Sequence, residues 1–172
     1  MILDVGCGSK PKGDVNVDLF FAPTHRGGEH VAFNPKTIKN FVLADAHYLP
    51  FRDEAFNIVY SSHLLEHCLH PFKVLQEFHR VSNSIVYLEI PYGERCPDDC
   101  PYHLYSWTSK SFEHLLSKLF PYVQCYCTER IAEKLRSGKK SLFGDLLLAF
   151  VRKTSHTLLR RKQISALCRK RK

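Results

Sequence analysis

Residues 3–8, Leu3-Asp4-Val5-Gly6-Cys7-Gly8, carry the pattern on which the fold prediction depends. A short apolar run ends there in two glycines that are one residue apart. Such glycines let the backbone turn sharply and come close to a bound ligand. Ligands of α/β sheets bind beyond the carboxyl ends of parallel strands, so a strand followed by Gly-x-Gly predicts a ligand site. A structural turn between two strands would show the same glycines and remains an alternative.

Apolar, β-prone runs alternate with segments of helical periodicity along the rest of the chain. This alternation predicts an α/β domain built on a mostly parallel sheet. Strands are expected at 1–5, 15–21, 41–44, 56–61, 85–90, 122–127 and 145–152, and helices at 69–81 and 109–119.

Acidic residues follow two of these strands, Asp18 after the second and Asp45 after the third. A carboxylate at a strand end can accept hydrogen bonds from ribose hydroxyls or from the exocyclic amine of adenine. A dinucleotide site would need a third glycine at position 11, but Pro11 stands there. The three strand ends therefore predict a pocket for an adenosine without phosphate, although one such Asp alone is usually a turn or helix cap.

The order and spacing of these motifs resemble the class I S-adenosylmethionine-dependent methyltransferases, over about residues 2–152. The group they resemble is the UbiE/Coq5-like (methyltransferase type 11) group. The stretches that carry the resemblance are 3–8, Asp18, 44–46, 49–51, 56–59, 61–67, 77–81 and 87–91.

The resemblance implies a Rossmann-like methyltransferase sheet of seven strands that ends in an antiparallel hairpin. It also implies in-line methyl transfer from S-adenosylmethionine, in which positioning supplies much of the catalysis. The implied cofactor-binding residues are Asp4, Gly6, Cys7 and Gly8 at the methionine part, Asp18 with Leu19 at the ribose, Asp45 and Ala46 at the adenine, and Ser61 and Ser62 near the sulfonium.

Two features depart from the family pattern. About six residues separate Gly8 from the second strand, whereas a parallel crossover usually takes a dozen or more, so the first crossover helix is expected to be lost or reduced. The chain also starts at its first strand, so the family's usual N-terminal helices are not expected. Both departures would expose the cofactor, and a non-catalytic relative is an alternative.

His63, Glu66 and His67 follow the fourth strand and are the candidate catalytic residues. A histidine with a pKa near neutrality could take a proton from a hydroxyl or amine acceptor. The alternative is that Glu66 and His67 begin the next helix and serve its packing and capping. No metal is predicted, although Cys96, Cys100 and His103 have a spacing that could hold zinc.

The basic residues are concentrated at the C-terminal end. Nine Lys or Arg and no acid lie between Arg152 and Lys172, which leaves 16 basic and 17 acidic residues before them. We therefore expect one methyltransferase domain at 1–153 and a basic tail at 154–172. The tail could bind RNA or an anionic membrane surface, or could be a solvated terminus.

Seven scattered cysteines and the lack of a long apolar run predict reduced thiols in a cytoplasmic protein. The leading functional hypothesis is a methyltransferase with a small-molecule, lipid-linked or RNA acceptor. A non-catalytic cofactor-binding or regulatory protein and a basic-tailed nucleic-acid-binding module are the alternatives. The sequence does not indicate the oligomeric state.

Overall fold

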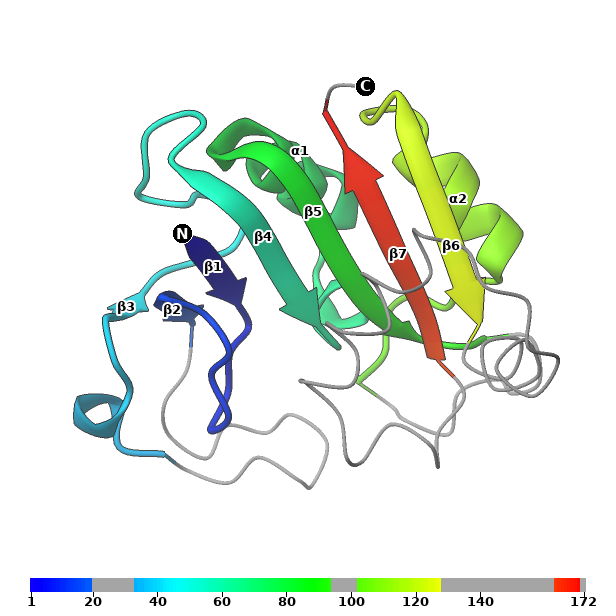
Figure 1. Ribbon diagram of the computed structural model, residues 1–172. Coiled ribbons are helices and arrows are strands. Elements are labelled where there is room, and N and C mark those ends of the chain that lie inside the picture. The colour runs from blue at the N-terminus through cyan, green and yellow to red at the C-terminus, as the bar shows by residue number, and fades with distance from the viewer. Residues whose placement is uncertain (20–32, 94–101, 128–162, 171–172) are drawn as a thin grey trace, which may run out of the picture.

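The computed structural model of the protein describes residues 1–19, 33–93, 102–127 and 163–170. Within them, seven strands form one sheet in the order β3-β2-β1-β4-β5-β7-β6 (Figure 1). The first five strands pair in parallel, and β7 is antiparallel to both β5 and β6. The strands are β1 (Ile2–Val5), β2 (Val15–Asp18), β3 (Phe41–Leu43), β4 (Phe56–Ser62), β5 (Ser82–Pro91), β6 (Tyr122–Cys127) and β7 (Gln163–Arg169). The predicted mostly parallel sheet with an antiparallel C-terminal hairpin is confirmed.

Both described α-helices, α1 (Pro71–Val81) and α2 (Ser109–Leu116), lie on the same side of the sheet (Figure 1). Val74, Leu75, Phe78 and Val81 of α1 are fully buried, whereas Phe72 is exposed. Helix α2 begins at a capping box in which Thr108 and Ser111 satisfy each other's backbone N–H groups. Two short 3₁₀ helices complete the described elements, η1 (Pro35–Thr37) and η2 (Leu65–His67).

The connection between β1 and β2 contains no helix, which confirms the reduced first crossover. Instead of a helix, a loop joins the two strands, and hydrogen bonds hold this loop against the sheet. Lys12 donates from its backbone to the Asp4 carboxylate at 2.7 Å and from its ammonium to the Tyr60 hydroxyl at 2.6 Å. Gly13 N donates to the Asn16 side chain at 3.0 Å. The loop therefore has a fixed path, which positions the glycine turn before it.

Strand β7 corrects the expected chain organisation. Residues 154–172 were predicted to form a basic tail, but Gln163–Arg169 pairs along its length with β5 and β6. Ile164, Ala166 and Cys168 are fully buried in the main core. The boundary at 153/154 is therefore wrong for this segment, and the strand expected at 145–152 lies outside the described residues.

The five described cysteines, Cys7, Cys68, Cys125, Cys127 and Cys168, are reduced, as the sequence predicts for them. Across the described ranges, no helix has both the length and the apolar character required to cross a membrane.

Candidate functional site

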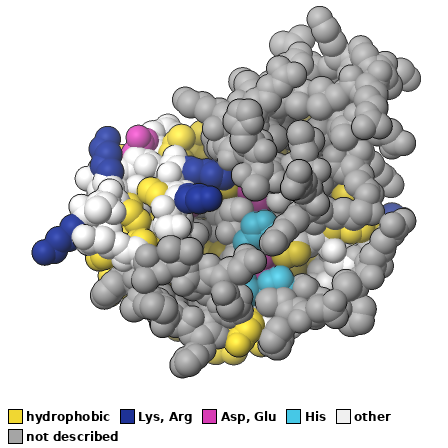
Figure 2. All heavy atoms as spheres, turned by 90° about the horizontal axis from the view of Figure 1, so that it is seen from below, with side chains coloured by type: hydrophobic (Ala, Val, Ile, Leu, Met, Phe, Trp, Pro, Cys, Tyr) yellow, Lys and Arg dark blue, Asp and Glu magenta, His cyan; other side chains and the backbone are white. Residues whose placement is uncertain are grey.

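A pocket opens at the carboxyl ends of β1, β2 and β3. The arrows of β1, β4 and β5 point to the lower edge of the sheet in Figure 1. Figure 2 shows this edge from below, with histidine side chains near its centre. Five of the predicted cofactor-binding residues line the pocket: Gly6, Asp18, Leu19, Asp45 and Ala46. The other lining residues are Val5, Val17, Ala44, His47, Leu64, His67, Cys68 and Leu69.

The glycine turn after β1 forms one wall of this pocket. Gly6 and Gly8 have φ angles of +77° and +53°, a region that favours glycine. The backbone N–H groups of Gly6 and Cys7 both donate to the Val17 carbonyl, at 2.8 and 3.1 Å. A side chain at Gly6 would also approach Leu64 to 3.2 Å. The turn therefore needs glycine at position 6 for its conformation and for its packing.

Asp18 connects the end of β2 to this turn. Its Oδ2 accepts a hydrogen bond from Gly8 N at 2.9 Å. An ionised carboxylate has about four acceptor positions, so this bond leaves the group able to accept from a ligand as well. Asp18 lines the pocket, in the position expected for a ribose-binding acid.

Asp45 stands at the end of β3 and is held by His47. Its Oδ1 accepts from His47 N at 2.9 Å and lies 2.6 Å from His47 Nδ1. This local turn fixes the direction of the carboxylate at the pocket wall. His47 was not among the predicted site residues, although an Asp followed two residues later by a hydrogen-bonding side chain is a recognisable turn pattern.

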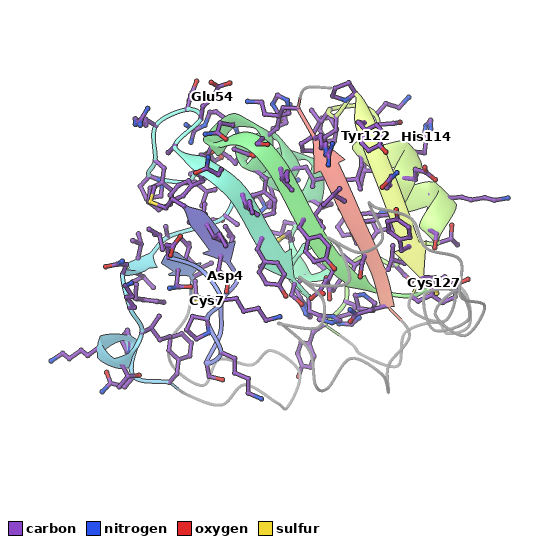
Figure 3. All side chains as sticks on the ribbon, in the orientation of Figure 1. Asp4, Cys7, Glu54, His114, Tyr122 and Cys127 are labelled. Atoms are coloured by element: carbon purple, nitrogen blue, oxygen red, sulfur yellow. The ribbon has the colours of Figure 1, made fainter. Side chains whose placement is uncertain are left out.

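The other predicted cofactor-binding residues lie beside the pocket and do not line it. Ser61 is buried and donates to the Val5 carbonyl at 2.8 Å, which joins β4 to β1. Ser62 is the last residue of β4. Asp4 and Cys7 lie near the lower end of β1 (Figure 3), both buried.

Burial gives the groups beside the glycine turn unusual acid–base properties. Burial raises the pKa of Asp4 to about 6, against the opposing effects of the Lys12 N–H and ammonium. Burial and the charges of Asp4 and Asp18 raise the pKa of the Cys7 thiol to about 12. Cys7 is therefore a neutral packing residue at physiological pH, and we assign it no nucleophilic role.

The three candidate catalytic residues lie together after β4. His63 adopts a left-handed φ of +53°, and its Nδ1 is 3.2 Å from Glu66 Oε1. Desolvation lowers the pKa of His63, but its hydrogen bond to Glu66 and the charges of Glu66 and Glu89 outweigh this and raise it. Glu66 is buried and His67 lines the pocket.

Glu66 and His67 belong to the 3₁₀ helix η2, and α1 begins four residues after His67 with His70 as its N-cap, so these two residues do not cap α1. Cys96 and Cys100, considered as zinc ligands with His103, lie outside the described residues. The His103 ring packs against His67 with 4.6 Å between centroids. The sequence could not reveal this contact, since 36 positions separate the two residues.

Residues 15–87 match a family described as a methyltransferase domain, which is less than half of the chain. No curated protein sequence matches the chain significantly.

Several solved structures share the fold. A Thermotoga maritima protein described as an S-adenosylmethionine-dependent methyltransferase, possible histamine N-methyltransferase, is 12% identical with a TM-score of 0.63, over 99% of this chain and 82% of that one. A Bacillus halodurans protein provisionally named a methyltransferase is 16% identical with a TM-score of 0.60, over 99% of this chain and 92% of that one. Haemonchus contortus phosphoethanolamine N-methyltransferase 2, solved with phosphomonomethylethanolamine and S-adenosylhomocysteine, is 14% identical with a TM-score of 0.60, over 99% and 48%.

The chain therefore has the fold of the S-adenosylmethionine-dependent methyltransferases, and residues 15–87 match a methyltransferase-domain family. The Haemonchus contortus enzyme has been solved both with S-adenosylhomocysteine and with S-adenosylmethionine. The narrower UbiE/Coq5-like assignment stays a prediction.

Proposed function

We propose that this protein is a methyltransferase of the UbiE/Coq5-like group that transfers a methyl group from S-adenosylmethionine to a small-molecule, lipid-linked or RNA acceptor in the cytoplasm. The observation that carries the proposal is the pocket beyond β1, β2 and β3. It combines a positive-φ glycine turn with two strand-end carboxylates, Asp18 and Asp45.

The residues of the pocket suit an adenosine without phosphate. Asp18 would accept from the ribose hydroxyls while it keeps its bond to Gly8 N. Asp45 would accept from the adenine amine with its carboxylate oriented by His47. No helix follows the glycine turn between β1 and β2, so nothing there offers a helix N-terminus to a pyrophosphate, which argues against NAD.

When bound, S-adenosylmethionine supplies an activated methyl group with a good leaving group. The protein then has to hold an acceptor in line with that group and remove its proton. His63 suits proton removal because Glu66 accepts a hydrogen bond from its ring and raises its basicity. His67 would contact the bound ligand from the pocket wall.

A non-catalytic cofactor-binding protein is the second candidate, and the missing helix between β1 and β2 favours it because the cofactor would be less covered. Contacts of the basic C-terminal segment argue against the third candidate, a basic-tailed nucleic-acid-binding module. Arg169 stacks over the Tyr122 ring, and Lys170 bonds Glu54 and the Ser82 carbonyl, so this part of the basic segment is joined to the sheet.

The proposal can be tested by incubating the protein and S-adenosylmethionine labelled on its methyl group with RNA, lipid and small-molecule fractions. We expect the label to enter one fraction with the native protein and not with Asp18→Asn. Cofactor binding without transfer to any fraction would favour the second candidate. A protein that neither binds the cofactor nor transfers its label would contradict both.

A further inference from the structure

Three side chains beside the pocket bring their ligand atoms together. Glu66, His67 and His103 each offer one oxygen or nitrogen atom, and these atoms all lie within 4.8 Å of one another. Metal–ligand bonds to zinc are about 2.0–2.2 Å long, so one ion could reach all three after small rotations of the side chains. The proposed methyltransferase function requires none of these three residues to bind a metal.

Hydrogen bonds already hold the two segments that carry the cluster in place. The Glu66 carbonyl accepts from Leu104 N at 2.7 Å and from Tyr105 N at 3.3 Å. The Tyr105 hydroxyl donates to the Leu69 carbonyl at 3.0 Å. His67 and His103 are therefore positioned by backbone contacts that do not depend on an ion.

The ring of His67 has the tautomer that a metal ligand requires. Its Nδ1 lies 3.0 Å from the Tyr102 carbonyl, which can only accept a hydrogen bond, so Nδ1 carries the hydrogen. In the neutral ring Nε2 then bears a lone pair. Metal-binding histidines almost always donate their second ring N–H to a carbonyl or carboxylate in this way.

The buried carboxylate of Glu66 is a second, independent observation in favour of a metal site. Its side chain is 1% exposed, and among the residues that the structure describes its Oε2 has no hydrogen-bond partner, while Oε1 pairs with His63. A buried carboxylate oxygen without a partner is costly, and such groups are rare in folded proteins. A cation beside Oε2 would compensate this group, with His63 on the other oxygen as the outer-shell partner.

We propose that Glu66, His67 and His103 bind a divalent transition metal ion, and that Zn²⁺ is the ion that the ligand set fits best. Two imidazoles and one carboxylate are a known zinc ligand set, and three protein ligands leave one position for water or a substrate atom. This proposal replaces the prediction of no metal. It shares only His103 with the alternative set of Cys96, Cys100 and His103.

The test measures binding of Zn²⁺ to metal-free protein in competition with a chromophoric chelator, without S-adenosylmethionine, so that its result does not depend on methyl transfer. We expect one ion per chain. Glu66→Gln and the double variant His67→Asn/His103→Asn should each lose at least about tenfold in affinity, since even outer-shell changes cost roughly 10- to 100-fold. His114→Asn is the matched control because His114 lies on α2, away from this edge (Figure 3), and its affinity should be unchanged.

His63→Gln is a second variant, at a side chain that is half-exposed. The affinity of this variant for Zn²⁺ should fall about 10- to 100-fold, and circular dichroism should show that its fold is intact. Zn²⁺ binding by the native protein no tighter than by the double variant would overturn the proposal. Full affinity in Glu66→Gln with loss of affinity in Cys96→Ser/Cys100→Ser would overturn it too, in favour of the cysteine set.

Discussion

The Asp18 carboxylate accepts a hydrogen bond from the backbone N–H of Gly8 at 2.9 Å, so the acid at the end of β2 is tied to the glycine turn after β1. The Asp18 side chain therefore has two roles. It supports the turn, and it presents acceptor oxygens to the pocket. The two roles predict different effects for two substitutions at the same position.

Asp18→Ala should raise the dissociation constant for S-adenosylhomocysteine by roughly ten- to a thousandfold, because two charge-assisted hydrogen bonds to ribose would be lost. It should also lower the free energy of unfolding by about 1 kcal/mol, because Gly8 N loses its acceptor. Asp18→Asn keeps an acceptor for Gly8 and should preserve stability while it weakens binding. Calorimetry and urea unfolding on both variants measure the two effects. Unchanged affinity in both would mean that Asp18 only supports the turn.

A chain that ends before Gln163 should not fold, because it lacks the strand that joins β5 to β6. Circular dichroism and thermal unfolding of this truncation measure the effect. A chain without residues 171 and 172 is the control, and it should melt as the full chain does. Cooperative unfolding of the longer truncation would show that β7 is dispensable.

The sequence predicted most strands of the sheet because they are short apolar runs with polar ends, such as Tyr122–Cys127. Strand β7 was missed because basic residues flank it and made the whole end resemble a tail. The apolar residues Ile164, Ala166 and Cys168 at every second position were the available signal, since period two is typical of a strand.

Some residues of the candidate site could likewise be predicted from the sequence, and others could not. Asp18 and Asp45 could be predicted because each follows a strand whose carboxyl end must face the ligand edge of the sheet. The contact between His67 and His103 could not, since it depends on how the loop after β5 returns to η2 through Leu104 and Tyr105. Such a return path leaves no local sequence pattern.

Asp4→Asn should change how stability depends on pH. The pKa of Asp4 is about 6 in the folded protein and 3.8 in its ordinary state, so the fold favours the protonated form. That contribution is fully present below about pH 3.8 and is lost as pH rises through about 6. Since Asn resembles the protonated acid, the variant should be more stable than the native protein near pH 8, by up to about 3 kcal/mol.

Urea unfolding of Asp4→Asn at several pH values between about 4 and 8 measures this effect. Glu113→Gln, at an exposed position of α2, is the control and should follow the native pH dependence. Parallel curves for Asp4→Asn and the native protein would contradict the assigned pKa.

Arg80→Ala should destabilise the fold, because Arg80 joins the end of α1 to the loop before β4. Its guanidinium donates to both oxygens of Glu77 and to the carbonyls of Leu49 and Phe51, at 2.7–3.0 Å. We expect a loss of about 1–3 kcal/mol in the free energy of unfolding. The neighbouring exposed Arg52 provides the control, and Arg52→Ala should stay within about 0.5 kcal/mol of the native protein. Equal effects of the two substitutions would show that the Arg80 contacts add nothing to stability.

The pocket beyond β1, β2 and β3 should bind the adenosine of S-adenosylmethionine. Calorimetric titration of the native protein with S-adenosylhomocysteine and, separately, with NAD measures this binding. We expect saturable one-to-one binding of S-adenosylhomocysteine and much weaker or no binding of NAD. NAD binding tighter than that of S-adenosylhomocysteine would contradict the claim.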